Sequence, residues 1–460
     1  MTNFSKKTWL WITYVLATLA LAVYLGIQLV AEPLKQDFLI GETSHGHYQI
    51  ELSCNACHTE AFGGTEMIQN TCVDCHEDEL KAAMDSHPKS KFTDPRNADL
   101  VDILDARYCV SCHVEHNPDV LHPMGVSLQT DYCVQCHLDI GDDRPSHENM
   151  EFDSCASAGC HNYHDNTALY ENFLLKHQDI TNPVIRQQPE KALSRYFEQK
   201  QISWQKVSME AASAEPLAKQ HHDAQIHADW ETSAHAENGV ACTSCHVDAE
   251  TADAQWIEQP SHEVCASCHE AETEGFLSGK HGMRLAQNLP PMTPAQARLP
   301  MHEQSQHLQL ECSSCHNAHS TNIVQASVES CLGCHADEHS RNFKQSPHGE
   351  LWEQAGRGEI PMEAAVSCAT CHLPRVEQDI LGEKLIKVEH NQNATLRPNE
   401  KMIRSSCMNC HSLAFSIDAL ADPNLIENNF QHAPTVHIKS IDMAVARDNE
   451  AQAKKGDANN

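Results

Sequence analysis

The sequence Cys368-Ala369-Thr370-Cys371-His372 places two cysteines three positions apart, with a histidine directly after the second. Nine other segments share this C-x-x-C-H spacing, and an eleventh has the longer form C-x-x-x-x-C-H. Together the eleven motifs use all 22 cysteines of the 460-residue chain. The others are Cys54-Cys57-His58, Cys72-Cys75-His76, Cys109-Cys112-His113, Cys133-Cys136-His137, Cys155-Cys160-His161 (the long form), Cys242-Cys245-His246, Cys265-Cys268-His269, Cys312-Cys315-His316, Cys331-Cys334-His335 and Cys407-Cys410-His411.

The motif is typical of c-type haem attachment, in which two thiols bond to the porphyrin and the adjacent histidine is an iron ligand. Zinc sites also use C-x-x-C pairs, but zinc requires no histidine directly after the second cysteine. Disulfide and redox C-x-x-C readings leave the histidine equally unexplained. We therefore expect eleven covalently attached haem c groups, with the motif histidines as proximal iron ligands.

The composition agrees with a chain that binds large apolar cofactors. Aromatic residues make up only 5% of the chain, and the mean hydropathy is -0.49, so side chains alone provide little core. We expect the porphyrins to form the core, with short helices near the motifs and loops around the cofactors. The fold class expected is mainly α with extensive coil, built around stacked haem pairs.

The charge and the N-terminal segment restrict the partners. A net charge of -32 argues against nucleic acid as a partner. From Trp9 to Ala31 the chain has no Asp, Glu, Lys or Arg, and 23 such residues are enough to span a bilayer as a helix. We expect an uncleaved signal anchor in the bacterial cytoplasmic membrane, with Lys6 and Lys7 on the cytoplasmic side and the haem domains in the periplasm. The alternative is a long cleaved signal peptide that ends near Ala31.

The second iron ligands are expected among the histidines outside the motifs. A serine precedes six of them by one to three positions, and each of these segments lies upstream of a haem pair or of the unpaired motif at 155. Four others lie three or four residues after a motif histidine, where helical spacing directs them to a neighbouring haem. The candidates are His45, His47, His87, His116, His147, His164, His235, His281, His319, His339, His348 and His390. The remaining alternatives are His122, His177, His227, His262, His302, His307, His432 and His437.

The distribution of motifs suggests five segments. They are a cytoplasmic tip and transmembrane anchor (1–35), a pentahaem domain (36–180), a helical linker (181–230), a hexahaem domain (231–425) and a C-terminal tail (426–460). An amphipathic helix is expected at about 189–210, because apolar residues recur there at helical spacing. Residues 444–460 lack aromatic side chains and are expected to be disordered.

The whole chain resembles membrane-anchored multihaem c-type cytochromes. The segments Glu338-His339-Ser340, Ser346-Pro347-His348-Gly349 and 366–375 resemble the hydroxylamine-oxidoreductase-like octahaem cytochromes, over about residues 231–425. In that family the resemblance implies a catalytic haem cross-linked to a tyrosine near the C-terminus. Here all eight tyrosines lie at or before Tyr196, and the chain stops 49 residues after His411, so both features argue against hydroxylamine oxidation.

Two functions remain open. In the first, every iron has two histidine ligands, and the protein conducts electrons without binding a substrate. Its donor would be a membrane quinol-oxidising complex or an anchored cytochrome, and its acceptor a periplasmic reductase or cytochrome. In the second, one haem of the hexahaem domain lacks its second ligand and reduces small nitrogen or sulfur oxyanions. We favour electron transfer over catalysis.

Overall fold

The computed structural model describes most of the chain, and its contacts divide the chain into two compact units. Described are residues 5–30, 32–60, 63–122, 125–128, 132–144, 147–148, 162–165, 171–179, 207–213, 215–221, 223–247, 255–380, 383–396 and 399–458. The first unit contains Met1–Glu77 and Pro88–Gln129, and the second contains Asp78–His87 and Thr130–Asn460. The five-segment division expected from the sequence stays a prediction.

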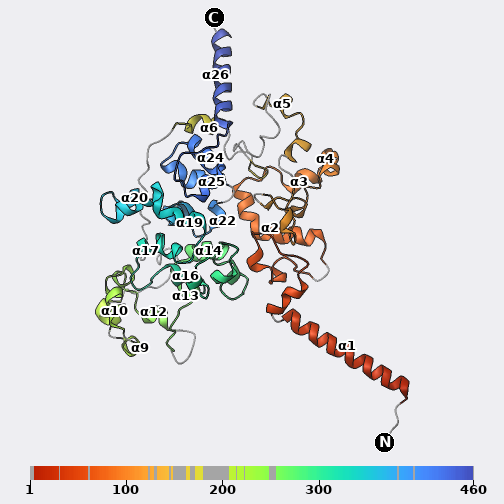
Figure 1. The fold of residues 1–460 in the computed structure, drawn as a ribbon, viewed down its shortest axis with the longest axis vertical. Helices are drawn as coiled ribbons and strands as arrows, with labels where there is room; N and C mark the ends of the chain where they lie inside the picture. The colour runs from red at the N-terminus through yellow and green to blue at the C-terminus, as the bar shows by residue number, and fades with distance from the viewer. Residues whose placement is uncertain are drawn as a thin grey trace. The chain divides into compact units, whose positions relative to one another are not determined.

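The first unit begins with a long apolar helix, α1 (Lys6–Val30), which Figure 1 shows as one uninterrupted element. The helix is long and apolar enough to cross a membrane, and signal sequences share these two properties. The rest of this unit consists of short helices and coil. They are η1 (Glu32–Phe38), η2 (Tyr48–Ile50), η3 (Cys54–Ala56), α2 (Thr65–Ala82, which continues into the second unit), α3 (Lys89–Thr93), η4 (Pro95–Asn97), α4 (Ala98–Ile103), η5 (Cys109–Ser111) and η6 (Pro118–Val120).

The second unit is also built from short helices joined by coil. From Tyr132 to Ser278 they are η8 (Tyr132–Gln135), α5 (Ile140–Asp143), α6 (Glu171–His177), α8 (Met209–Ser213), α9 (Pro216–Gln220), α10 (Ala224–Glu231), α11 (Ala234–Glu237), α12 (Thr243–His246), α13 (His262–Ala266) and α14 (Glu270–Ser278). From Met283 to His372 they are α15 (Met283–Ala286), η11 (Pro294–Gln296), η12 (Glu303–Ser305), α16 (Cys312–Cys315), α17 (Ile323–Ser327), α18 (Glu329–Leu332), α19 (Glu338–Asn342), η13 (Phe343–Gln345), α20 (Pro347–Gly356), η14 (Met362–Ala364) and α21 (Cys368–His372). After a strand pair follow α22 (Gln392–Leu396), α23 (Asn399–Ser405), η15 (Cys407–Asn409), α24 (Leu413–Ala421), α25 (Pro423–Glu427) and α26 (Ser440–Ala458).

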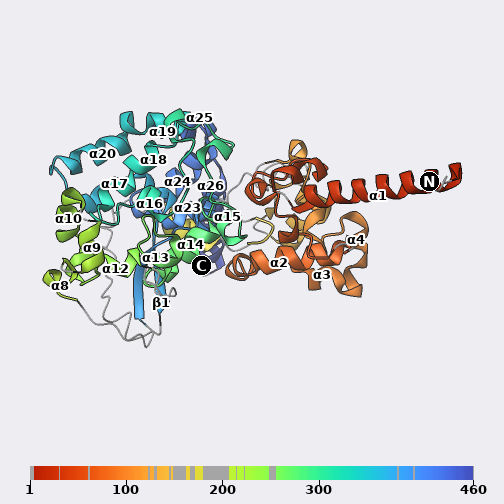
Figure 2. The ribbon, with the colours of Figure 1, turned by 90° about the horizontal axis from the view of Figure 1, so that it is seen from below.

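The only sheet among the described residues is an antiparallel pair, β1 (Arg375–Ile380) and β2 (Glu383–Val388), visible in Figure 2. Its register places Arg375 opposite Val388 and Ile380 opposite Glu383. The predicted fold class, mainly α with extensive coil, is confirmed.

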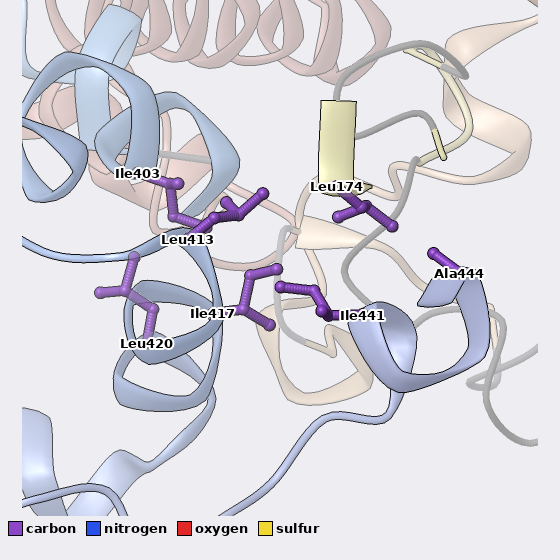
Figure 3. Close-up of a cluster of buried hydrophobic side chains, with 7 residues drawn as sticks. All are labelled: Leu174, Ile403, Leu413, Ile417, Leu420, Ile441 and Ala444. Atoms are coloured by element: carbon purple, nitrogen blue, oxygen red, sulfur yellow. The ribbon is translucent and has the colours of Figure 1, made fainter. Parts of the chain in front are cut away.

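The larger apolar cluster among the described residues joins α6 to helices near the C-terminal end of the second unit. Leu174 of α6, Ile403 of α23 and Ile441 of α26 pack around α24, and Figure 3 shows their side chains converging. On α24 the contributing residues Leu413, Ile417 and Leu420 recur at helical spacing. This cluster positions the segment after the last motif.

The expected disorder of 444–460 is wrong, because α26 is helical through Ala458. The segment is rich in Ala, which favours helix, and Ile441 and Ala444 anchor the first turns of α26 in the apolar cluster. Most of the amphipathic helix expected at about 189–210 lies outside the described residues.

Candidate functional site: paired histidines beside cysteine motifs

Most C-x-x-C-H motifs fold into the same short turn. In eight of them the histidine N–H donates to the carbonyl of the first cysteine, at 2.8 to 3.0 Å. These are the motifs of His58, His113, His137, His246, His269, His316, His335 and His411. Residues three and four positions apart lie on one face of a helical turn, so both thiols and the imidazole project from the same turn. The motif Cys155-Cys160-His161 lies outside the described residues.

Each of nine motif histidines faces a histidine from outside the motifs. In the first unit the distance between ring centres is 6.4 Å for His58 and His116 and 5.9 Å for His76 and His47. In the second unit the pairs are His137–His87 (6.1 Å), His246–His319 (5.9 Å), His269–His235 (6.3 Å), His316–His390 (6.2 Å), His335–His281 (6.3 Å), His372–His339 (6.1 Å) and His411–His348 (6.0 Å). Every pair thus combines one motif histidine with one of the candidates.

This separation fits two imidazoles on opposite sides of one metal ion. A metal–nitrogen bond of about 2 Å, with about 1.1 Å from nitrogen to ring centre, gives about 6 Å between the two centres. In the described part of the chain, no group of three or more His, Cys, Asp or Glu is arranged to hold a metal ion by itself. Two protein ligands per metal beside two thiols is the donor set that haem c requires, because the porphyrin supplies the other four nitrogens. The residues therefore fit covalently bound haem.

Hydrogen bonds at Nδ1 prepare several of these histidines for metal binding. His116 donates to the Gly41 carbonyl at 2.9 Å, His235 to the Ala318 carbonyl at 2.9 Å, and His390 to the Val388 carbonyl at 3.0 Å. His87 and His339 donate to the carbonyls of Tyr163 and Ile426, and motif histidines His113 and His246 to those of Gly125 and Ile257. A proton held on Nδ1 leaves the lone pair on Nε2, as in most metal-bound histidines.

Burial keeps the deeper imidazoles neutral. Loss of solvent, with a smaller contribution from the facing histidine, lowers the pKa of His281, His348 and His372 to about 4. Only the neutral ring offers a lone pair to a metal. These three side chains are therefore available as ligands at neutral pH.

The recurring serine before a histidine is explained by helix capping at two sites. Ser233 and Ser346, both buried, are the N-caps of α11 and α20, and their hydroxyls accept from the N–H groups of Ala236 and Gly349. The cap starts the helix so that His235 and His348 lie in its first turn. A Cβ at Gly349 would lie 2.0 Å from the Phe343 carbonyl oxygen, so this close approach requires glycine.

Motifs that follow one another in sequence are neighbours in space within each unit. Thiol–thiol hydrogen bonds join Cys72 to Cys109, Cys265 to Cys312 and Cys331 to Cys368, and in each pair they raise the pKa of one thiol. Burial is the main cause that raises the pKa of Cys57, Cys245, Cys315 and Cys407. Nearby thiols add to it: Cys75, after Glu115, beside Cys57, Cys265 beside Cys245, Cys331 beside Cys315 and Cys371 beside Cys407. The three motifs from 54 to 109 and the six from 242 to 407 therefore form two uninterrupted series.

Three of the twelve sequence candidates are not among the facing pairs. His45 packs near Tyr48, with ring centres 5.8 Å apart, and it is His47 that faces His76. His164 donates from Nδ1 to Asp85 at 3.1 Å. The backbone N–H of His147 donates to the Arg144 carbonyl. The assignment of all twelve as iron ligands stays a prediction.

Sequence reasoning missed the residues that support the imidazoles. The indole of Trp256 stacks on His246 at 4.6 Å, and Phe415 stacks on His411 at 4.7 Å. Phe415 follows His411 by four residues, a helical spacing that could have revealed it. The carboxylate of Glu115 bonds to His47 across 68 positions, for which the sequence carries no local signal.

Comparison with known proteins agrees with this donor set. Residues 46–138 and 234–336 match the cytochrome c3 family. A multihaem cytochrome, MtrA of Shewanella baltica (strain OS185), is 25% identical over 215 residues, which cover 42% of this chain and 54% of MtrA. The chain therefore spans about half the length of this curated relative. The two matching segments contain four C-x-x-C-H motifs each, and they are similar to multihaem cytochromes, a likeness that implies covalently bound haem c.

Proposed function

We propose that this protein transfers electrons through eleven covalently attached haem c groups. The 22 motif cysteines would hold the porphyrins, and the eleven motif histidines would be the proximal iron ligands. For nine haems the second ligands would be His47, His87, His116, His235, His281, His319, His339, His348 and His390. The observation that carries this proposal is the set of nine facing imidazole pairs, each with ring centres 5.9 to 6.4 Å apart.

Two histidines at one metal favour electron transfer over substrate chemistry. Haem supplies a reversible one-electron iron couple when it is bound. The two imidazoles of each pair would be the protein ligands of the iron; their Nδ1 hydrogen bonds would hold them in place, and they would exclude other ligands. A site filled in this way has no position at which an oxyanion could bind.

The order of the motifs supports two continuous routes for electrons. Successive motifs have adjacent thiols from Cys57 to Cys109 and again from Cys245 to Cys407. Electron transfer in short steps requires cofactors that follow one another closely in space, and none of these steps requires a substrate. We propose that each series acts as one conduit.

The apolar helix α1 and the two lysines at its start support the proposed location, from which we propose the partners. Helix α1 would anchor the protein in the cytoplasmic membrane, with Lys6 and Lys7 inside and the haem-binding units in the periplasm. A quinol-oxidising complex or an anchored cytochrome would be the donor, and a periplasmic reductase or cytochrome the acceptor. We also propose that residues 231–425 fold like the octahaem cytochromes that they resemble. The activity of those proteins is not part of the proposal.

Haem counting and carbon monoxide binding test the proposal. The intact mass of the denatured protein should contain eleven haem increments, and a count of ten would indicate that Cys155-Cys160-His161 is not used. The visible spectrum should be entirely low-spin and unchanged by carbon monoxide. A high-spin fraction that binds carbon monoxide would instead support the reduction of nitrogen or sulfur oxyanions at an open iron.

A further inference from the structure

A carboxylate supports one of the two facing pairs in the first unit. Glu115 Oε1 accepts from His47 Nδ1 at 2.6 Å and from the Ser44 hydroxyl at 2.8 Å. Its Oε2 accepts from the Ser44 backbone N–H at 2.7 Å. All three partners donate to it, which is the arrangement that a deprotonated carboxyl group accepts.

The second facing pair of this unit offers a natural comparison. His116, which faces His58, donates from Nδ1 to the Gly41 carbonyl at 2.9 Å. That acceptor is neutral, whereas the acceptor of His47 carries a full negative charge. The two pairs otherwise share a motif histidine, an external histidine and similar ring separations.

We propose that Glu115 is a positioning residue that lowers the midpoint potential of the haem bound by His76 and His47. The proposal rests on the proposed function, in which that haem is present. A carboxylate at Nδ1 makes the imidazole a more basic ligand and places negative charge beside the iron. Reduction adds one electron and removes one positive charge from the iron, so both effects stabilise the oxidised state. Because Glu115 bonds directly to His47 and not to His116, its effect is expected to be larger at the His76–His47 site than at the His58–His116 site.

The substitution Glu115→Gln removes the charge and keeps the size of the side chain. The glutamine Oε1 can still accept from His47 and the Ser44 hydroxyl, whereas its NH2 group cannot accept from the Ser44 backbone N–H. In a redox titration of the full-length protein, the midpoint potential of one haem equivalent should rise. The expected change in its redox equilibrium constant is at least tenfold, which corresponds to about 59 mV for a one-electron couple. The matched control is Glu51→Gln. Glu51 accepts from Thr43 in the same unit, so its removal tests for a general charge effect.

The substitution Ser44→Ala tests the same hydrogen bonds, and it should shift the midpoint potential of the haem in the opposite direction. It removes a neutral donor from Glu115 Oε1, so more of the carboxylate charge acts on His47. The same haem equivalent should then move to lower potential. General damage to the site would not produce shifts of opposite direction in the two variants.

The outcomes separate this inference from the proposed function. Opposite shifts in one haem equivalent, with a low-spin spectrum throughout, would support the role of Glu115. An unchanged titration in both variants, equal shifts in both, or the same shift in Glu51→Gln would overturn it while leaving the electron-transfer proposal intact. Loss of the proposed function itself would be seen in the parent protein, as missing haems or a high-spin spectrum.

Discussion

One indole determines how a single imidazole is oriented. Trp256 lies between His221 and His246, with ring centres 4.4 and 4.6 Å away and interplanar angles of 6° and 8°. An isolated β-bridge between Val247 and Trp256 aligns the indole with the motif histidine. The planes of His246 and His319 are within 8°, whereas those of His87 and His137 are at 81°. The stack thus orients His246, whose plane is nearly parallel to that of His319.

Replacing Trp256 with Leu should therefore alter the low-spin electron paramagnetic resonance spectrum. Iron with parallel imidazole planes gives a rhombic signal, and iron with perpendicular planes gives a strongly anisotropic one. We expect the rhombic signal to lose intensity as the His246 ring becomes free to rotate. Trp256→Phe should keep the signal, because it keeps the stack and removes an indole N–H that has no partner among the described residues. An unchanged spectrum in Trp256→Leu would contradict this role.

Removing His348 should open one iron. Its ring centre is 6.0 Å from that of His411, and the thiols of Cys407 and Cys410 would keep the haem attached. We expect His348→Ala to convert one haem to a high-spin form that binds carbon monoxide, measured by visible spectroscopy. The control is His432→Ala, since the His432 ring bonds to Asn428 and the Ala433 carbonyl. A fully low-spin His348→Ala protein would exclude His348 as a ligand.

The limits of sequence reasoning at this scale are visible at positions 45 and 47. The recurring Ser-His pattern favoured His45, yet His47 faces the motif histidine, because the turn before η2 and the bond to Glu115 direct its side chain. Serine precedes a facing histidine at Ser346, where it caps a helix, and also at Ser86, where it does not. The assignment of His45 stays a prediction. His390 had no pattern at all, because β2 and its hairpin bring it to His316.

At the scale of elements, the sequence predicted which kinds of secondary structure form better than it predicted where they form. The short turns at the motifs followed from the spacing of cysteines and histidine, which is local. Helix α26 could not be predicted from its lack of aromatic residues, because its first turns are stabilised by Leu174 and Ile417, distant in sequence. Local propensity was sufficient for helix, and tertiary packing made it stable.

The start of α26 should be sensitive to alkaline pH. His437 donates to Asp418 at 3.0 Å and to Asp442 of α26 at 2.7 Å, and these two carboxylates raise its pKa from 6.5 to about 9. A raised pKa in the folded state gives stability that is fully present below pH 6.5 and lost as the pH rises through about 9. Hydrogen exchange at residues 440–447, corrected for the intrinsic rate, should accelerate across this range.

The substitution His437→Gln provides the control for this pH effect. A side chain that does not titrate should give the same corrected exchange at pH 6.5 and pH 9.5, at the level of the parent protein at high pH. If the variant and the parent kept identical pH profiles, the ion pairs of His437 would not be responsible for docking α26.

At the scale of the whole molecule, side chains alone provide little core. Among the described residues the buried apolar clusters are small, and the larger has seven buried residues. The sequence predicted this property from its few aromatic residues, although it could not give the location of the clusters.

A chain with so little internal packing should not fold without its cofactors. The free energy that offsets chain entropy would come from apolar porphyrin surface and from the two histidines at each iron, as in other proteins whose folding is coupled to metal binding. We expect protein made without haem attachment to show little helical circular dichroism and no cooperative thermal transition. Residual helicity should be confined to α1 and the cluster around α24, because these regions are apolar without cofactor. A stable, colourless protein with native helicity would contradict the haem core, and a hydrogen-exchange map of that protein would identify the polypeptide contacts that replace it.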